Sequence, residues 1–325
     1  MRPVVVLTDG SIRREAVDLL AATCEVIVLD AYPAEATLAA ACSHADAILA
    51  RLGTVTRRVM DAAPKLRIIA RHGVGVDAVD LAAATERGIV VTTTGSENAA
   101  AVAEYTFALL LALKRHVVRA DTDMRQGLWH REPLVGGELD GRTLGIVGYG
   151  AIGRRVARQA QGFGMRVLAH DRVGVSPDPG VELTSLHDLL ARSDVVSLHA
   201  RLTPDNVHLL DARALALMKP DACVVNTARG ELIDESALAA ALRGGALAGA
   251  ALDTYEREPL PADSILRTLP NVLLSPHVAG QTEAALRRVA ETAARCILDE
   301  LAGRMPRFVY NPEAYGRRPA GWPTR

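Results

Sequence analysis

The chain has 325 residues, 49% of them hydrophobic and 23% charged, and its formal net charge is −1. This length is too great for one ordinary core and predicts two domains of a globular protein. The charge is almost balanced and no basic block occurs, which argues against a nucleic-acid partner. No apolar run approaches the roughly 20 residues that cross a bilayer, so we expect no membrane span.

The cysteines and the first residues bear on the compartment. Cys24, Cys42, Cys223 and Cys296 are scattered without the spacing of metal ligands, which predicts buried thiols and no metal site. Residues 3–7 enter a strand at once, without the basic region and apolar core of a signal peptide. We therefore expect a cytoplasmic protein.

Short apolar runs alternate with amphipathic segments along the chain. The first series of predicted strands covers residues 4–7, 26–29, 47–49, 68–70 and 89–92. Short apolar runs with helices between them form parallel strands that helices cover on both faces. The series therefore predicts a doubly wound α/β domain.

A glycine-rich loop, residues 72–78, follows the fourth run of this series. It looks like a dinucleotide-binding turn, but the next run, residues 88–93, ends in threonines and lacks the acid that would bind a ribose. We expect the amides of Gly73, Val74 and Gly75 to bind a carboxylate instead, as a backbone anion nest.

A long helix is predicted from Asn98 to about Arg125, with Val102, Leu109 and Leu113 on one face. It opens the second domain. A second series of strands follows it, at residues 144–148, 167–170, 195–199, 223–227, 248–253 and 272–275.

The last predicted helix, residues 282 to about 301, is expected to cross back to the first domain. We therefore expect a first domain of residues 1–97 plus 282–312, a second domain of residues 98–281, and a tail of residues 313–325. Two crossings predict a hinge and an interdomain cleft with the active site. The chain from Asn311 is polar and proline-rich, which predicts loose order.

The sequence GYGAIG at residues 148–153 lies between a predicted strand and a predicted helix, residues 154–163. Gly148 permits a tight turn, Gly150 lets the backbone approach a phosphate, and Gly153 lets the helix pack close to the strand. The helix would direct its N–H groups at the pyrophosphate of a dinucleotide.

Asp171 ends the next strand, 23 residues after Gly148. An acid at this place accepts hydrogen bonds from the adenosine ribose and repels a 2′-phosphate, which favours NAD over NADP. Arg172 follows directly, and its positive charge would partly reduce the preference for NAD over NADP. The alternative is a structural glycine turn with a chance acid behind it.

Three chemically versatile side chains follow strands of the second series: Arg229, Glu258 and His277. Taken singly, each has an ordinary reading, as a surface arginine, a solvated loop acid and a histidine bonded to backbone. Together they form a mechanism for reducing a ketone. The histidine would protonate the carbonyl oxygen as hydride arrives, the glutamate would stabilise the charged imidazole, and the arginine would hold the substrate carboxylate through two hydrogen bonds.

The chain resembles the D-isomer-specific 2-hydroxyacid dehydrogenases, the group that holds phosphoglycerate dehydrogenase and glyoxylate/hydroxypyruvate reductase. The resemblance covers roughly residues 1–312. It rests on GYGAIG with Asp171, on NTARG at 226–230, on Glu258-Pro259, on SPH at 275–277 with Gly280, on VAE at 102–104, and on residues 71–81.

The resemblance implies a flavodoxin-like substrate domain, a Rossmann NAD-binding domain, and a homodimer built largely through the latter. It implies that Arg229, Glu258 and His277 are catalytic, with His277 as acid/base, for a small 2-keto or 2-hydroxy acid. The combined cofactor-binding set is Gly148, Gly150, Ala151, Ile152, Gly153, Asp171, Thr227, Ala228, Asp253, His277 and Gly280. The substrate set is Arg51, Gly73, Val74, Gly75 and Arg229.

Some positions depart from the family pattern. Arg201 stands where the family often has proline, near the expected adenine side, and Leu52 replaces a small polar residue after Arg51. A phosphate on the substrate would need several cations near Arg51. Arg57 and Arg58 are candidates, although arginines on a helix are more often solvated. Trp129 and His130 either reach a partner's site or pack locally.

Other readings stay open. Phosphoglycerate-like and hydroxypyruvate- or glyoxylate-like substrates both fit. A related enzyme, formate dehydrogenase, has glutamine in place of Glu258, and a carboxylate there suits proton donation by His277 better. The alternative from a different class is an NAD(H)-sensing regulatory protein of the same fold with little turnover.

Overall fold

The computed structural model describes residues 2–30, 33–172, 174–319 and 322. The chain divides into two compact units, which are described separately: unit 1 is residues 1–98 with 281–325, and unit 2 is residues 99–280. These limits differ by one residue from the predicted ones at each crossing. The roles of substrate domain and NAD-binding domain stay predictions.

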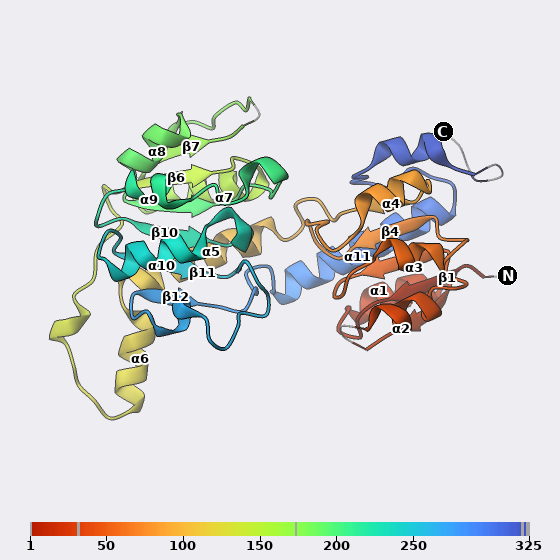
Figure 1. Ribbon diagram of the computed structural model, residues 1–325, viewed down its shortest axis with the longest axis horizontal. Coiled ribbons are helices and arrows are strands. Elements are labelled where there is room, and N and C mark those ends of the chain that lie inside the picture. The colour runs from red at the N-terminus through yellow and green to blue at the C-terminus, as the bar shows by residue number, and fades with distance from the viewer. Residues whose placement is uncertain (1, 31–32, 173, 320–321, 323–325) are drawn as a thin grey trace. The chain divides into compact units, whose positions relative to one another are not determined.

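Unit 1, which contains the red and orange strands β1 and β4 labelled in Figure 1, has a five-stranded, wholly parallel sheet in the order β2-β1-β3-β4-β5. Its strands are β1 Val4–Leu7, β2 Glu25–Val28, β3 Ala47–Ala50, β4 Ile68–Arg71 and β5 Val90–Thr92. This is the flavodoxin-like order, so the predicted fold of the first domain is confirmed.

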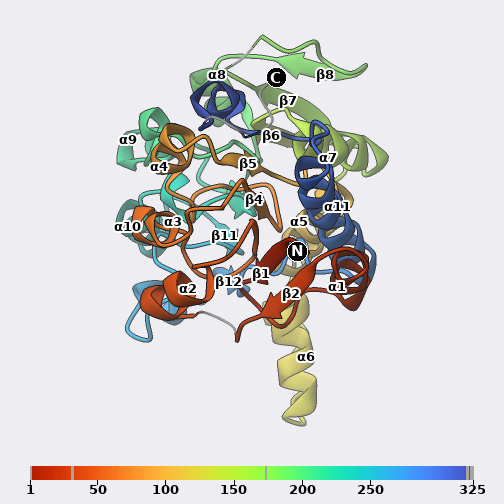
Figure 2. The ribbon, with the colours of Figure 1, turned by 90° about the vertical axis from the view of Figure 1, so that its right-hand side faces the viewer.

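Helices cover both faces of this sheet (Figure 2). They are α1 Arg14–Ala21, α2 Glu35–Ala41, α3 Arg57–Asp61, α4 Leu81–Glu86 and α11 Glu283–Leu301. Because side chains alternate along a strand, Val5 and Leu7 pack with α1 and α11, whereas Val6 packs with α2 and α3. All these side chains are fully buried.

The chain after α11 is packed on unit 1, so the prediction of loose order from Asn311 is wrong for residues 311–318. The buried Asn311 side chain accepts a hydrogen bond from Val91 N at 2.7 Å and donates to Ile89 O at 3.0 Å. A 3-10 helix, η5 Pro312–Arg317, then brings Arg318 to the buried carboxylate of Glu300, 2.6 Å away. The end of the predicted tail, residues 320–321 and 323–325, lies outside the described residues.

Unit 2 contains a seven-stranded parallel sheet in the order β12-β11-β10-β9-β6-β7-β8. The strands are β6 Thr143–Val147, β7 Arg166–His170, β8 Val181–Leu183, β9 Val195–Leu198, β10 Cys223–Asn226, β11 Gly249–Leu252 and β12 Val272–Leu274. This is the Rossmann order with one further strand, as predicted for the second domain. β8 was not predicted, because only Val181 of its three residues is buried and no apolar run marks it.

Two long helices cover one face of this sheet and three shorter ones the other. The first two are α5 Ala99–Lys114 and α7 Ala151–Gly162; the others are α8 Leu186–Arg192, α9 Ala212–Ala216 and α10 Glu235–Arg243. The described residues of unit 2 also form the short 3-10 helices η1 Glu132–Leu134, η2 Pro204–Asn206, η3 Gly230–Leu232 and η4 Ile265–Thr268.

The prediction of a single helix from Asn98 to about Arg125 is wrong, because the structure has two helices there. The backbone of His116 is left-handed, with φ 53°, and separates α5 from α6 Val117–Arg125. At the end of α5, Lys114 O accepts a hydrogen bond from Gly137 N, so the returning chain satisfies the helix terminus. Among the described residues, no helix has the length and apolar character needed to cross a membrane.

Candidate active site

The glycine turn between β6 and α7 has the geometry that its sequence predicts. Gly148 has φ +95°, and a Cβ on it would lie 2.4 Å from Ala200 N. A Cβ on Gly153 would lie 2.3 Å from Gly148 O, so this glycine lets the helix approach the strand. Gly150 has no atom within 4 Å of its Cβ position, which leaves open space beside the helix start. This space fits the phosphate of a dinucleotide.

Asp171 lies directly against this turn. Its Oδ2 atom accepts a hydrogen bond from Tyr149 N at 2.7 Å, so the acid that follows β7 is held at the glycine motif. The Tyr149 side chain is buried and donates to Asp178 at 2.9 Å. Arg172 turns to Asp205, 3.2 Å away, and both side chains are largely exposed.

The residues after β10 form a turn that is shaped by the buried side chain of Asn226. Its amide donates to Arg229 O at 2.8 Å, and its carbonyl oxygen accepts from Ala228 N at 3.0 Å. Thr227 lies 3.0 Å from Thr106 of α5, hydroxyl to hydroxyl. This turn places the Arg229 side chain at the carboxyl edge of the sheet.

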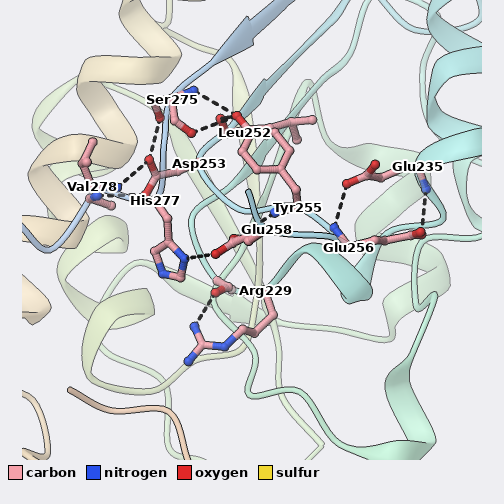
Figure 3. A network of polar contacts seen from close by, with 12 residues as sticks. Arg229, Glu235, Leu252, Asp253, Tyr255, Glu256, Glu258, Ser275, His277 and Val278 are labelled. Carbon is pink, nitrogen blue, oxygen red and sulfur yellow. Dashed lines mark hydrogen bonds and ion pairs between the residues drawn. The ribbon is translucent and has the colours of Figure 1, made fainter. Parts of the chain in front are cut away.

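The turn after β10 touches the loop after β11. A Cβ on Gly230 would come within 1.8 Å of the carbonyl carbon of Tyr255, so only glycine permits this approach. The contact brings Arg229 and Glu258 into the same region (Figure 3). Arg229 also donates from Nη1 to Ala228 O at 2.7 Å.

Asp253, at the end of β11, anchors the turn that carries His277 (Figure 3). Its fully buried carboxylate accepts hydrogen bonds from Ser275 Oγ at 2.6 Å, Val278 N at 2.9 Å and Ala279 N at 2.8 Å. These bonds hold His277 between them in a left-handed conformation, with φ 54°. Asp253 was predicted only as a cofactor contact, and this anchoring role was not predicted.

The imidazole of His277 meets the carboxylate of Glu258 (Figure 3). Nδ1 lies 2.7 Å from Oε2, while Oε1 accepts from Tyr255 N at 3.1 Å. Burial is the largest influence on Glu258 and opposes its ionisation, but the hydrogen bond and charge of His277, with the Tyr255 amide and the Arg229 charge, together outweigh burial, and the pKa of Glu258 is lowered. An ionised Glu258 makes Nδ1 the proton-bearing nitrogen, which leaves Nε2 for a reacting group.

Tyr255 ties the ends of β11 and β12 together and was not predicted. Its buried hydroxyl lies 3.0 Å from Leu252 O and 2.8 Å from Ser275 O. Burial raises the pKa of Tyr255 to about 12, so the hydroxyl stays a hydrogen-bond donor at neutral pH. No sequence spacing marks this pairing, because it joins loops that follow different strands.

Unit 1 carries the predicted substrate residues at the carboxyl edge of its own sheet. Arg51 follows β3 and its Nη1 lies 3.1 Å from the buried carboxylate of Asp9, so its charge is already partnered. Gly73 follows β4 with φ +146°. His72 precedes it, and burial, aided by the nearby Arg51 charge, lowers the pKa of His72 to about 4.

The remaining candidates lie on the surface. Arg57 pairs with Glu86 at 2.8 Å and Arg58 with Glu35 at 3.5 Å, which supports the solvated reading of these arginines. Trp129 is 75% exposed and packs little within the chain. His130 lies 3.6 Å from Asp123.

Known proteins share this sequence and fold. The model of the family "D-isomer specific 2-hydroxyacid dehydrogenase, NAD binding domain" matches residues 107–279. A glyoxylate reductase of Korarchaeum cryptofilum is 41% identical over 301 residues, which are 90% of this chain and 91% of that protein. A D-3-phosphoglycerate dehydrogenase of Methanocaldococcus jannaschii is 39% identical over 95% of this chain, but the match spans 59% of that protein.

A solved structure extends the likeness to three dimensions. It is an NADPH-dependent glyoxylate/hydroxypyruvate reductase from Sinorhizobium meliloti, in complex with NADP and malonate. Its TM-score to this chain is 0.88 at 30% identity, over 97% of this chain and 98% of that one. The resemblance found in the sequence is therefore confirmed. The chain belongs to the D-isomer specific 2-hydroxyacid dehydrogenase family and is an oxidoreductase that acts on 2-hydroxy acids.

Proposed function

We propose that the protein is an NAD-dependent D-2-hydroxyacid dehydrogenase in which His277 is the acid/base. The observation that carries the proposal is the 2.7 Å contact between His277 Nδ1 and Glu258 Oε2, at the sheet edge that also bears Arg229. A histidine oriented by a carboxylate is the arrangement that general acid/base catalysis needs. Binding of NAD(H) by a regulatory protein with little turnover does not require a carboxylate-oriented histidine.

Each side chain has a separate task in this reaction. Nε2 of His277 would give a proton to the carbonyl oxygen of a 2-keto acid, or take it back from the hydroxyl of the product. Glu258 would stabilise the imidazolium and fix the orientation of the ring. The Arg229 guanidinium would bind the substrate carboxylate through two parallel hydrogen bonds and polarise the carbonyl.

The nicotinamide of NAD supplies or accepts hydride when it is bound. The open space at Gly150 and the start of α7 would hold its pyrophosphate, with Ala151 and Ile152 in the first helical turn. Asp171 would bind the adenosine ribose and disfavour a 2′-phosphate. The solved relative that uses NADPH is a reason to measure this preference directly.

The substrate would be a small 2-keto or 2-hydroxy acid, since relatives are named for glyoxylate and for 3-phosphoglycerate. We assign its binding also to the amides of Gly73, Val74 and Gly75, and we include Arg51, although Asp9 offsets the charge of that arginine.

Exposed apolar side chains around α6 support a homodimer through unit 2. Val117, Val118, Met124, Trp129 and Val135 are each more than half exposed. Exposed apolar groups in such number indicate a protein contact, and a second copy of this chain is the partner that we propose. The four buried, unpaired cysteines suit a reducing cytoplasm.

The experiment that tests the function is the loss of NADH absorbance with a panel of keto acids: glyoxylate, hydroxypyruvate, pyruvate, 2-ketoisocaproate and 3-phosphohydroxypyruvate. We expect turnover of at least one of them, with NADH preferred over NADPH. NADH binding without turnover across the panel would contradict the proposal and support a regulatory role.

A further inference from the structure

The peptide between Tyr255 and Glu256 is held by a reciprocal pair of hydrogen bonds (Figure 3). The Glu235 carboxylate accepts from Glu256 N at 2.8 Å, and the Glu256 carboxylate accepts from Glu235 N at 3.1 Å. We call this pair the Glu235–Glu256 clasp. The same peptide lies against Gly230, whose Cβ position is 2.3 Å from Glu256 N. The clasp thus fastens the loop after β11 to the start of α10.

The Tyr255–Glu256 peptide adjoins the residue whose amide binds Glu258, the partner of His277. Tyr255 N donates to Glu258 Oε1 at 3.1 Å, which leaves Oε2 to accept from His277 at 2.7 Å. A shift of the Tyr255–Glu256 peptide would carry Tyr255 N with it. The Glu258 carboxylate would then lose the bond that directs its second oxygen at the imidazole.

Glu235 is not needed to begin its own helix. Asp234 is the N-cap of α10, and its Oδ1 atom accepts from Ala237 N at 2.9 Å. Burial raises the pKa of Glu235, so placing this carboxylate there costs free energy. The hydrogen bond from Glu256 N offsets part of this cost.

We propose that Glu235 is a positioning residue for the reaction: it holds the Tyr255–Glu256 peptide on Gly230 and so directs Glu258 at His277. The inference rests on the proposed function and extends it to a residue that acts through a backbone peptide. The other half of the clasp uses the backbone N–H of Glu235. Substitution of the Glu235 side chain therefore does not remove this second hydrogen bond. Glu256 also has another partner, His208 Nε2, which lies 3.0 Å from Glu256 Oε1.

Three variants separate positioning from folding. Glu235→Ala removes the acceptor, Glu235→Gln keeps a carbonyl acceptor, and Glu235→Asp keeps the charge but is shorter by one methylene. Glu283→Ala is the matched control, because Glu283 is the first residue of α11 as Glu235 is of α10. For each variant kcat, the KM values for NADH and keto acid, and the melting temperature are measured.

We expect kcat of Glu235→Ala to fall about 10-fold or more while both KM values stay within about 3-fold, because small misplacements of catalytic groups lower kcat. Glu235→Gln should recover kcat to within about 3-fold of wild type, since its carbonyl still accepts. The kcat of Glu235→Asp should lie between those of the Ala and Gln variants. If the Ala variant does not fold, the comparison of Asp with Gln tests the positioning role. The control should keep wild-type kcat.

Unchanged kcat in folded Glu235→Ala, with only a lower melting temperature, would overturn the positioning role. A Gln variant as slow as the Ala variant would overturn it too, because an acceptor at this position would then not restore the reaction. In both cases an active wild type leaves the proposed function intact. A wild-type protein that binds NADH but reduces no keto acid would overturn both.

Discussion

Glu258 Oε2 lies 2.7 Å from His277 Nδ1, although the two residues are 19 positions apart and follow different strands. The Asp253 carboxylate fixes the His277 turn, and the Tyr255 amide fixes the Glu258 carboxylate. The pair is therefore oriented from both sides before any substrate binds. Preorganisation of this kind is what allows an imidazole to transfer a proton in one fixed direction.

The first prediction concerns His277→Gln. The amide cannot donate or take a proton in the reaction, so we expect kcat for keto-acid reduction to fall by about 10²–10⁴-fold. NADH affinity, measured by fluorescence titration, should stay within a few-fold, since the glycine turn and Asp171 are untouched. Loss of NADH binding in a folded variant would show that His277 acts mainly as a cofactor contact and not as the acid/base.

The second prediction concerns Glu258→Gln and pH. The pKa of Glu258 is lowered, so its ionised form stabilises the folded state above the ordinary carboxyl range, and this contribution is lost as pH falls through the lowered pKa. The variant should therefore melt below wild type at neutral pH, and the difference should vanish in acid. If the difference in melting temperature between wild type and variant were the same at every pH, ionisation of Glu258 would not stabilise the fold.

The third prediction concerns Asp171→Ala and the choice of cofactor. Without the carboxylate the ribose loses a charged acceptor, and the repulsion of a 2′-phosphate disappears. We expect the ratio of kcat/KM for NADH to that for NADPH to fall by about 10-fold or more. The matched control is Asp205→Ala, which releases Arg172 but keeps the acid at the turn. An unchanged ratio in Asp171→Ala would remove this residue from the ribose site.

Much of this site was predictable because parallel strands end at one edge of a sheet. Arg229, Glu258 and His277 each follow a buried apolar run, and that rule alone places them together. The glycine motif was predictable because its strand, turn and helix start follow one another in the sequence: Gly148 takes the positive φ of the turn, and Gly153 lies against Gly148 O. Short-range geometry and strand order thus carried the prediction.

The parts that were missed depend on contacts between distant residues. The Glu235–Glu256 clasp joins a helix start to a loop 21 positions away, and Tyr255 joins the ends of two strands. The packed segment after α11 was missed for the same reason. Asn311 and the prolines around it look like a loose tail until the buried partner of each polar group is known.

The fourth prediction concerns the buried carboxylate of Glu300 in unit 1. It accepts from Arg318 at 2.6 Å, from Arg67 at 3.3 Å and from the Tyr315 hydroxyl at 3.2 Å, and it is fully buried. Removing one partner of a buried ion pair leaves uncompensated charge. Glu300→Gln should therefore lower the free energy of unfolding of unit 1 by about 3–5 kcal/mol.

The measurement for Glu300 is urea unfolding together with hydrogen exchange at Val91 N, whose bond to Asn311 reports whether the C-terminal segment stays docked. Glu313→Gln is the control, since this exposed acid lies in the same segment and its loss should cost less than about 0.5 kcal/mol. If Glu300→Gln has the same free energy of unfolding as Glu313→Gln, the segment after α11 is held by Asn311 and apolar packing. If Val91 exchanges faster in Glu300→Gln alone, the buried ion pairs are what dock it against β5.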